Sequence, residues 1–460
     1  MPAPPDMPAP PDMPAPPDPG TARVHDAPAA DLTTARLESL TGLRWFAALG
    51  VFLSHVNVLL PLPHLGGLFS VGASGVSLFF ILSGFVLTWT FRPGDTPAAF
   101  YARRFARIWP LLVLAVVLPT MFALTAKTQE SAVYQVTIAL SAILLIQAWV
   151  PGWILLGASP VTWSLSCEAA FYAIFPSTVR RVIGWSNRRL VVVACACVAL
   201  LWALRIGLWV WYPPQAHLTT LNGFGPEVLG VYSPVARIPQ FILGMVIAVA
   251  IRRGWRAVSV RTAVLVTVLP IVVLWLLDGY TFRSQALFDG ADQVMTPCYA
   301  LLIAALARAD IMGKRSFLRS RPLVKLGQWS YAFYLFQFTV LLPLALKASP
   351  GKTVPDFFIH PVTPGWGFLG YGLAGLAITL VLSAACYRYI EHPLEKYLRR
   401  RLVAAADRRW PAPAPAAASA SPSPTVEPPP VPLPTASSPT ASSPTASSPT
   451  APSPTRREHG

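Results

Sequence analysis

Long apolar stretches dominate the sequence and constrain its fold more than any other feature. A helix needs about 20 apolar residues to cross the hydrocarbon core of a bilayer, and eleven stretches of roughly this length follow one another. They span residues 43–61, 71–91, 107–126, 132–150, 162–179, 190–212, 233–251, 262–278, 293–311, 326–346 and 367–389. Only 12% of the residues are charged and 54% are hydrophobic, a balance that cannot cover a soluble surface. The sequence therefore predicts an all-α fold, a polytopic membrane helical bundle.

Clusters of basic residues predict the orientation of this bundle. Lys and Arg concentrate on the cytoplasmic side of membrane proteins, and they gather here at 103–107, 180–189, 252–261, 314–321 and 396–401. Three apolar stretches separate the first two clusters, although an even number of crossings must join them. We therefore expect the stretch 132–150 to be re-entrant or shallow. About ten transmembrane helices then remain, with both termini in the cytoplasm of a bacterial cell and the core in its plasma membrane.

The two ends of the chain differ from its core. Residues 1–40 contain three MPAPPD repeats, and residues 401–460 combine a basic juxtamembrane segment with TASSP repeats. Such Pro-, Ala- and Ser-rich segments bury too little apolar surface to fold, so we expect disordered tails around a membrane core at 41–400. The N-terminus lacks the basic and apolar regions of a signal peptide. The net charge of +16 is explained by cytoplasmic loops, so nucleic acid is not an expected partner.

The five cysteines all lie in apolar stretches, and their spacing matches no zinc site. We therefore expect no metal and interpret them as small core residues. Cys167, next to Glu168, is kept as a candidate acyl carrier.

Two ionisable residues share one face of the first apolar stretch. Arg44 and His55 are eleven residues apart, which is three helical turns and about 16 Å along the axis. Histidine is the side chain best suited to accept a proton near neutral pH, and charged groups inside a membrane are costly and usually functional. His55 is therefore a candidate catalytic base, and the alternative is a histidine that only joins two helices.

The stretch that begins at residue 162 carries a polar stripe. Ser164, Glu168 and Tyr172 recur every four residues, so they lie on one face of a helix. Glu168 has no basic neighbour in its own stretch, and we expect Arg237 of the 233–251 stretch to be its partner. Two interpretations are open, a catalytic carboxylate and a structural buried ion pair.

The stretch 326–346 carries a second polar face, formed by Ser330, Tyr334 and Gln337. These side chains line a cavity or join helices through hydrogen bonds, and the sequence does not distinguish the two.

Three arginines precede the stretch 107–126. Arg103, Arg104 and Arg107 lie at one membrane surface, with Arg104 and Arg107 one helical turn apart. Paired arginines bind phosphates well, although topology control and contact with lipid headgroups are the simpler explanation.

Seven of these segments, taken in order, resemble the acyltransferase-3 family of integral-membrane acyltransferases. The resemblance covers about residues 41–400 and consists of Leu43-Arg44…His55, Gly75–Phe85, Arg103-Arg104…Arg107-Ile108…Pro110, Trp163-Ser164-Leu165…Glu168…Phe171-Tyr172, Arg237…Phe241…Gly244, Leu326-Gly327…Ser330-Tyr331…Tyr334-Leu335 and Tyr389-Ile390-Glu391…Pro393. It implies transfer of an acyl group, expected to be acetyl, from cytoplasmic acyl-CoA to a hydroxyl, often on a surface carbohydrate. No permanently bound cofactor is implied.

The resemblance also assigns roles to residues. It implies catalytic roles for Arg44, His55 and Glu168, and it places Arg104 and Arg107, with Arg103 beside them, near the CoA phosphates. The chain departs from the family pattern at Gln337, where a second histidine is common, and at Ala169, where a second acid often follows Glu168. In the expected mechanism His55 deprotonates the acceptor hydroxyl or is transiently acylated, and Glu168 orients the imidazole or balances its charge.

Other readings of the sequence stay open. The acceptor is a cell-envelope glycan or a small secondary metabolite such as a macrolide. A transporter or flippase would also need a polar-lined bundle, and a membrane sensor would explain the tails but not the buried ionisable residues. The oligomeric state is not indicated by any feature of the sequence.

Overall fold

A computed structural model describes residues 36–125, 131–150, 153, 159–211, 230–278, 290–354, 356–359 and 362–410. The predicted tail repeats lie outside these residues. Within them all regular structure is helical, as predicted. The longer helices are α1 (Glu38–Leu59), α3 (Gly75–Trp89), α4 (Pro97–Thr125), α5 (Ala132–Ile143), α6 (Trp163–Gly184), α7 (Asn187–Trp211), α9 (Pro234–Arg252), α10 (Val260–Asp278), α12 (Ala291–Ile311), α13 (Arg321–Ala348), α15 (Phe368–Cys386) and α16 (His392–Arg409).

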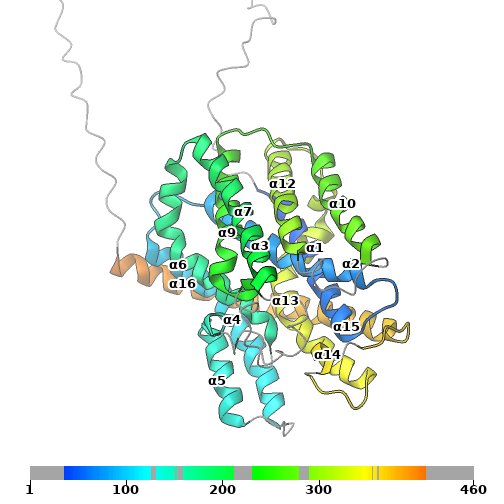
Figure 1. Cartoon of the computed structure of the whole chain (residues 1–460). Coiled ribbons are helices and arrows are strands. Elements are labelled where there is room, and N and C mark those ends of the chain that lie inside the picture. Colours follow the sequence, from blue (N-terminus) through cyan, green and yellow to red (C-terminus); the bar gives the residue numbers. More distant parts are fainter. Residues whose placement is uncertain are drawn as a thin grey trace, which may run out of the picture. The chain divides into compact units, whose positions relative to one another are not determined.

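Short helical segments join the long ones (Figure 1). They are α2 (Gly66–Val71), η2 (Gly72–Ser74), η3 (Gln147–Trp149), η5 (Pro160–Thr162), η7 (Phe317–Arg319), α14 (Asp356–Ile359) and η8 (Tyr387–Glu391). Polar caps and prolines set several helix starts. The Ser233 side chain accepts a hydrogen bond from the Ala236 N–H, and Pro234 opens α9, where a missing N–H costs nothing.

Eight helices of the described chain are long and apolar enough to cross a membrane, which confirms a polytopic helical bundle. Two other predicted crossings correspond to α6 and α10, which fall outside that group. The α5 helix has 12 residues, about 18 Å at 1.5 Å per residue. It is too short to cross a bilayer core of about 30 Å by itself, in line with the expectation that 132–150 does not span.

The α1 and α13 helices pack side by side and run in the same direction. Thr41 meets Gly327, where a Cβ atom would collide with the Thr41 carbonyl oxygen. Further along, the Arg44 Nε donates to the Ser330 Oγ at 3.4 Å, and the His55 ring packs edge-on against Phe338 at 5.4 Å. This register places the polar residues of α13 beside those of α1, turn by turn.

A close crossing of α3 and α9 forms the middle of the bundle. A Cβ atom on Gly84 would collide with the Phe241 carbonyl oxygen, and one on Gly244 with the Ile81 carbonyl oxygen. Small residues allow helices in membranes to approach at this distance. The Phe241 ring also stacks on Phe171 at 4.8 Å, which fixes α6 against α9.

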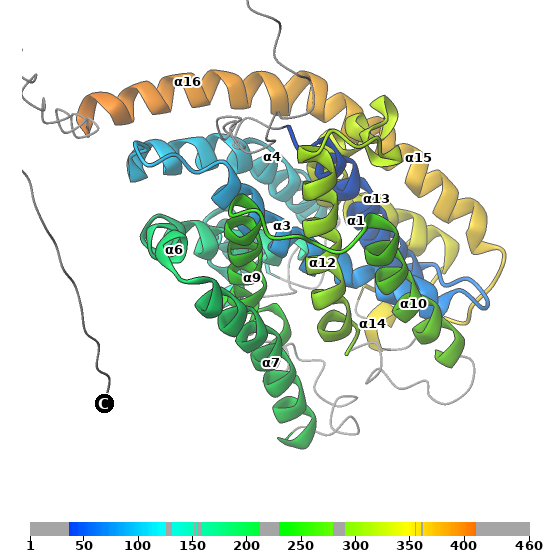
Figure 2. The same ribbon diagram turned by 90° about the horizontal axis from the view of Figure 1, so that it is seen from above.

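The chain turns from α15 into α16 through η8, a single π-helical segment. Such segments interrupt the regular helix and often occur at functional sites. Here the segment places Glu391 inside the protein, with 1% of its surface exposed. Beyond it α16 runs along α4 (Figure 2).

Candidate active site

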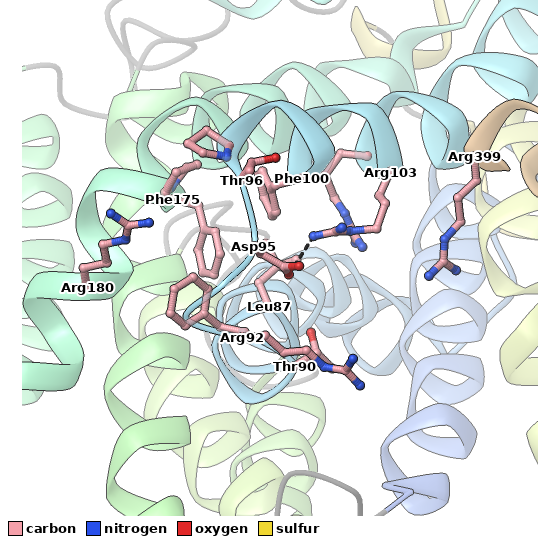
Figure 3. Close-up of a pocket in the computed structure, with 14 residues that line it drawn as sticks. Leu87, Thr90, Arg92, Asp95, Thr96, Phe100, Arg103, Phe175, Arg180 and Arg399 are labelled. Atoms are coloured by element: carbon pink, nitrogen blue, oxygen red, sulfur yellow. Dashed lines mark hydrogen bonds and ion pairs between the residues drawn. The ribbon is translucent and has the colours of Figure 1, made fainter. Parts of the chain in front are cut away.

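A pocket rich in arginine opens where the end of α3, the start of α4 and the end of α6 meet α16 (Figure 3). Its volume is about 350 Å³, within the range of small-molecule sites. Five arginines line it together with Asp95 and the rings of Phe91, Phe100 and Phe175. The arginines are Arg92, Arg103, Arg104, Arg180 and Arg399. We call it the arginine pocket, and its lining combines positive charge with flat apolar surfaces.

Two predicted phosphate ligands lie in the arginine pocket. The Arg103 guanidinium forms an ion pair with Asp95 at 2.7 Å, which Figure 3 shows directly. The Arg104 guanidinium lies over the Phe100 ring, 5.8 Å from its centroid. Its buried Nε has no hydrogen-bond partner among the described residues. The Arg104 guanidinium therefore has a buried N–H that a ligand could bind.

Arg107 is not part of the arginine pocket. Its guanidinium pairs with Glu391 at 2.5 Å and with Glu395 at 2.7 Å, and it lies 5.6 Å from the centre of the Tyr331 ring. Two carboxylates therefore already balance its charge and tie α4 to the start of α16. The expected Arg104–Arg107 phosphate clamp is divided in the structure. Arg104 faces the pocket, and Arg107 holds two helices together.

The polar stripe of α6 lies next to the arginine pocket. The Tyr172 hydroxyl donates to the Glu168 carboxylate at 2.9 Å, which confirms that the two share a face. Phe100, a pocket residue, meets the Tyr172 ring at 6.2 Å. Arg44 and Arg104 both interact electrostatically with Glu168. Glu168 thus interacts both with an arginine of the pocket and with one of α1.

The expected pairing of Glu168 with Arg237 is wrong. Arg237 pairs with Asp292 at the start of α12, at 2.8 Å. The Ser77 hydroxyl donates to the same carboxylate at 2.7 Å, and the Gln240 Nε2 donates to the Ser77 Oγ at 2.9 Å. Arg237 therefore belongs to a hydrogen-bonded network on α3, α9 and α12. The carboxylate that neutralises it comes from α12, whereas the polar pattern of α6 had pointed to Glu168.

The polar face of α13 runs between these regions. Ser330 accepts from Arg44, as described above, and the Tyr334 hydroxyl lies 2.8 Å from the Ser164 hydroxyl of α6. Gln337 is fully buried, and neither its amide oxygen nor its amide nitrogen has a partner in the described chain. Ser330 and Tyr334 join helices, whereas Gln337 does not.

His55 lies near the far end of α1 from Arg44. It is partly buried, and its Nδ1 has no hydrogen-bond partner in the part of the chain that the structure describes. No described carboxylate forms an ion pair with it. The expectation that Glu168 orients His55 is therefore not supported by the geometry. The imidazole is held by the Phe338 ring and has a nitrogen free for chemistry.

Several residues of these clusters escaped prediction. Glu391 and Glu395 are four residues apart, a spacing that puts both carboxylates on one helix face. Asp292 directly precedes the apolar stretch 293–311, and an acid at this position could have been considered as a partner for Arg237. Arg92 follows α3, Arg180 lies near the end of α6 and Arg399 lies inside α16, so no single sequence window unites them.

Comparison with known proteins decides the family. The acyltransferase domain of the acyltransferase-3 family matches residues 37–388. The chain belongs to the acyltransferase-3 family. This membership makes the protein a membrane acyltransferase and favours the enzyme over the transporter and sensor interpretations.

Named relatives agree with this assignment. Acyltransferase MdmB of Streptomyces mycarofaciens is 35% identical over 392 residues, which are 81% of this chain and 95% of the relative. Nodulation protein 10 of Rhizobium leguminosarum bv. viciae is 25% identical and covered to 98%. O-acetyltransferase OatA of Staphylococcus aureus (strain NCTC 8325 / PS 47) is 22% identical over 78% of this chain, which spans 57% of OatA. No solved structure matches the chain.

Proposed function

We propose that this acyltransferase moves an acetyl group from cytoplasmic acetyl-CoA to a hydroxyl of a carbohydrate, such as a cell-envelope glycan. The observation that carries the proposal is the arginine pocket, which lies beside the polar stripe of α6. The likeness to OatA, which is named an O-acetyltransferase, supports both the acetyl group and the oxygen acceptor.

The arginine pocket suits the nucleotide end of CoA. CoA carries a diphosphate and a 3′-phosphate, and five arginines against one aspartate give the pocket a strong positive excess. Guanidinium groups bind phosphates through paired hydrogen bonds. The rings of Phe91, Phe100 and Phe175 offer flat surfaces to adenine. A pocket for a neutral sugar would not need this charge.

The position of the pocket also suits delivery of the thioester. Arg104 lines the pocket and interacts electrostatically with Glu168, and Arg44 of α1 also interacts with Glu168. The pantetheine arm would extend from the pocket along this polar row toward His55. The basic residues of the loops support a cytoplasmic position for the pocket, by the positive-inside rule.

The chemical step follows from these assignments. The acceptor hydroxyl oxygen forms a bond to the acyl carbon while its proton passes to His55. The tetrahedral intermediate collapses, the carbon–sulfur bond breaks, and the CoA thiolate takes the proton from His55. Glu168 offsets the charge of the arginines along the donor route, and it does not contact the imidazole. Among the described residues, no group of three or more His, Cys, Asp or Glu side chains could hold a metal ion.

The donor assignment is tested by binding and transfer together. Purified protein in detergent micelles is titrated with CoA, and membranes of a deletion strain that carries each variant receive [14C]acetyl-CoA. We expect saturable CoA binding and transfer of label to a non-lipid product. A double variant with Arg92→Gln and Arg180→Gln should bind CoA at least tenfold more weakly than the wild type. Wild-type protein that binds no CoA and transfers no label would overturn the proposal.

The acceptor class is decided by mass spectrometry of the labelled product. We expect an acetyl increment on a glycan that disappears in the deletion strain. If the increment lies instead on a small metabolite, the glycan assignment fails and the acetyl-CoA donor stands.

A further inference from the structure

Gln337 stands out among the buried polar residues of the described chain. None of its surface is exposed, and both polar atoms of its amide lack a hydrogen-bond partner among the described residues. A buried polar group without a partner costs roughly 1–3 kcal/mol. Each such group in a folded protein calls for an explanation, and a catalytic role is one of those recognised.

Gln240 shows what a satisfied buried glutamine looks like in the same bundle. It is 1% exposed. Its Nε2 donates to Ser77 at 2.9 Å and to Thr296 at 3.2 Å, and its Oε1 accepts from Arg237 at 3.5 Å. The bundle therefore supplies partners to an amide whose role is structural, whereas the described part of the chain supplies none to Gln337.

The helix register places Gln337 at the depth of His55. The α1 and α13 helices run parallel, and His55 packs against Phe338, the residue that follows Gln337. Gln337 also shares a face with Ser330 and Tyr334, which contact Arg44 and Ser164. The amide thus stands at the end of the polar row that begins at the arginine pocket. Close to it lies the His55 Nδ1, which among the described residues is the one buried side-chain polar atom of α1 without a hydrogen-bond partner.

The arrangement answers a need of the reaction. When the hydroxyl oxygen adds to the thioester, the carbonyl oxygen becomes an oxyanion, which needs a positioned donor. His55 carries the proton and cannot also supply that donor from the same nitrogen. A buried amide N–H without a competing partner is suited to the task, because no existing hydrogen bond has to break first.

We propose that Gln337 is a catalytic residue, whose Nε2–H donates to the acyl carbonyl oxygen of the donor and stabilises the oxyanion. The inference rests on the proposed acetyl-CoA function and assigns a specific atom to it. The carbonyl oxygen gains its negative charge as the acceptor oxygen bonds to carbon, and it loses that charge when the carbon–sulfur bond breaks. Gln337 neither gains nor loses a proton.

The test compares two buried glutamines. Gln337→Met removes the amide and keeps the side-chain length, and Gln240→Met does the same in the satisfied network. We expect Gln337→Met to lower the maximal rate of [14C]acetyl transfer by about 10²–10³-fold, the usual effect of losing one oxyanion donor. The KM for acetyl-CoA should change less than threefold. Its thermal unfolding temperature should equal or exceed that of the wild type, because an unpartnered amide is removed.

Two further variants sharpen the result. Gln337→Glu keeps the shape without the donor and should be as impaired as Gln337→Met. Gln337→His restores an N–H donor and should recover part of the rate. Gln240→Met should unfold at a lower temperature and keep its turnover per folded molecule.

The outcomes separate the two proposals. If wild-type protein transfers no label from acetyl-CoA, both fail. If the wild type is active and Gln337→Met is equally active, only the role of Gln337 fails. A Gln337→Met protein that is destabilised as strongly as Gln240→Met also contradicts the role, because the amide would then be structural.

Discussion

Two buried polar regions of this acyltransferase differ in how their hydrogen bonds are arranged. The Arg237–Asp292 network on α3, α9 and α12 satisfies its members among themselves. The row on α1 and α13 ends at His55 and Gln337, which keep polar atoms without partners in the described residues. Closed networks hold helices together, whereas unpartnered buried groups are poised for a ligand. In the proposed mechanism, the first region serves the fold and the second serves the reaction.

We expect the largest loss of stability when the Arg237–Asp292 network is broken. Asp292→Ala leaves the Arg237 guanidinium buried without its carboxylate, and we expect a loss of about 3–5 kcal/mol in the free energy of unfolding. Thermal unfolding in detergent, followed by tryptophan fluorescence, measures it. Arg237→Met combined with Asp292→Leu should recover much of the loss, since no charge then stays unpaired. A single variant as stable as the wild type would show that the network is dispensable.

The Arg107 cluster should resemble the closed network on a smaller scale. Arg107→Gln leaves Glu391, which is 1% exposed, without its cation. We expect the protein to lose roughly 2–4 kcal/mol, near the lower end of the cost of breaking a buried pair. Adding Glu391→Gln should restore part of it, and the double-mutant cycle gives the coupling energy. Additive effects would contradict the pairing.

Arg104 should matter for binding of the donor more than for stability. Arg104→Gln removes a charge that has no carboxylate bonded to it, and we expect the KM for acetyl-CoA to rise about tenfold, near 1.4 kcal/mol of binding. The unfolding temperature should stay within two or three degrees. Glu395→Gln is the matched control at the same surface and should leave KM unchanged. An unchanged KM for Arg104→Gln would exclude it from the donor site.

The smallest effect is expected at the link between the two helices of the polar row. Tyr334→Phe removes one hydroxyl that is hydrogen-bonded to Ser164, and we expect a loss of about 1 kcal/mol in stability. Turnover per folded molecule should fall less than fivefold. A larger drop in turnover would show that Tyr334 takes part in the reaction and does not only join the two helices.

Local patterns in the sequence predicted much of this arrangement. The apolar stretches gave the helical bundle, and helical spacing placed Glu168 beside Tyr172 and aligned Ser330 with Tyr334. These features depend on residues within a few turns of one another, where periodicity is informative.

Contacts between distant helices could not be predicted in the same way. The sequence offers Arg237 both Glu168 and Asp292 as partners, and the packing of α9 against α12 selects Asp292. Arg399 reaches the arginine pocket because the π-helical segment at Tyr387–Glu391 redirects α16 along α4, and no sequence period encodes that turn. The unpartnered state of Gln337 likewise follows from its neighbours, which the sequence does not show.

In the proposed mechanism, acyl transfer depends on the imidazole of His55. The most direct measurement is the rate of [14C]acetyl transfer per folded molecule for His55→Ala, with thermal unfolding recorded on the same preparation. We expect transfer to fall by about 10²–10⁴-fold, the contribution of a general base, while the unfolding temperature stays close to that of the wild type. A folded His55→Ala protein that transfers acetyl groups at the wild-type rate would contradict the role of His55 as the general base.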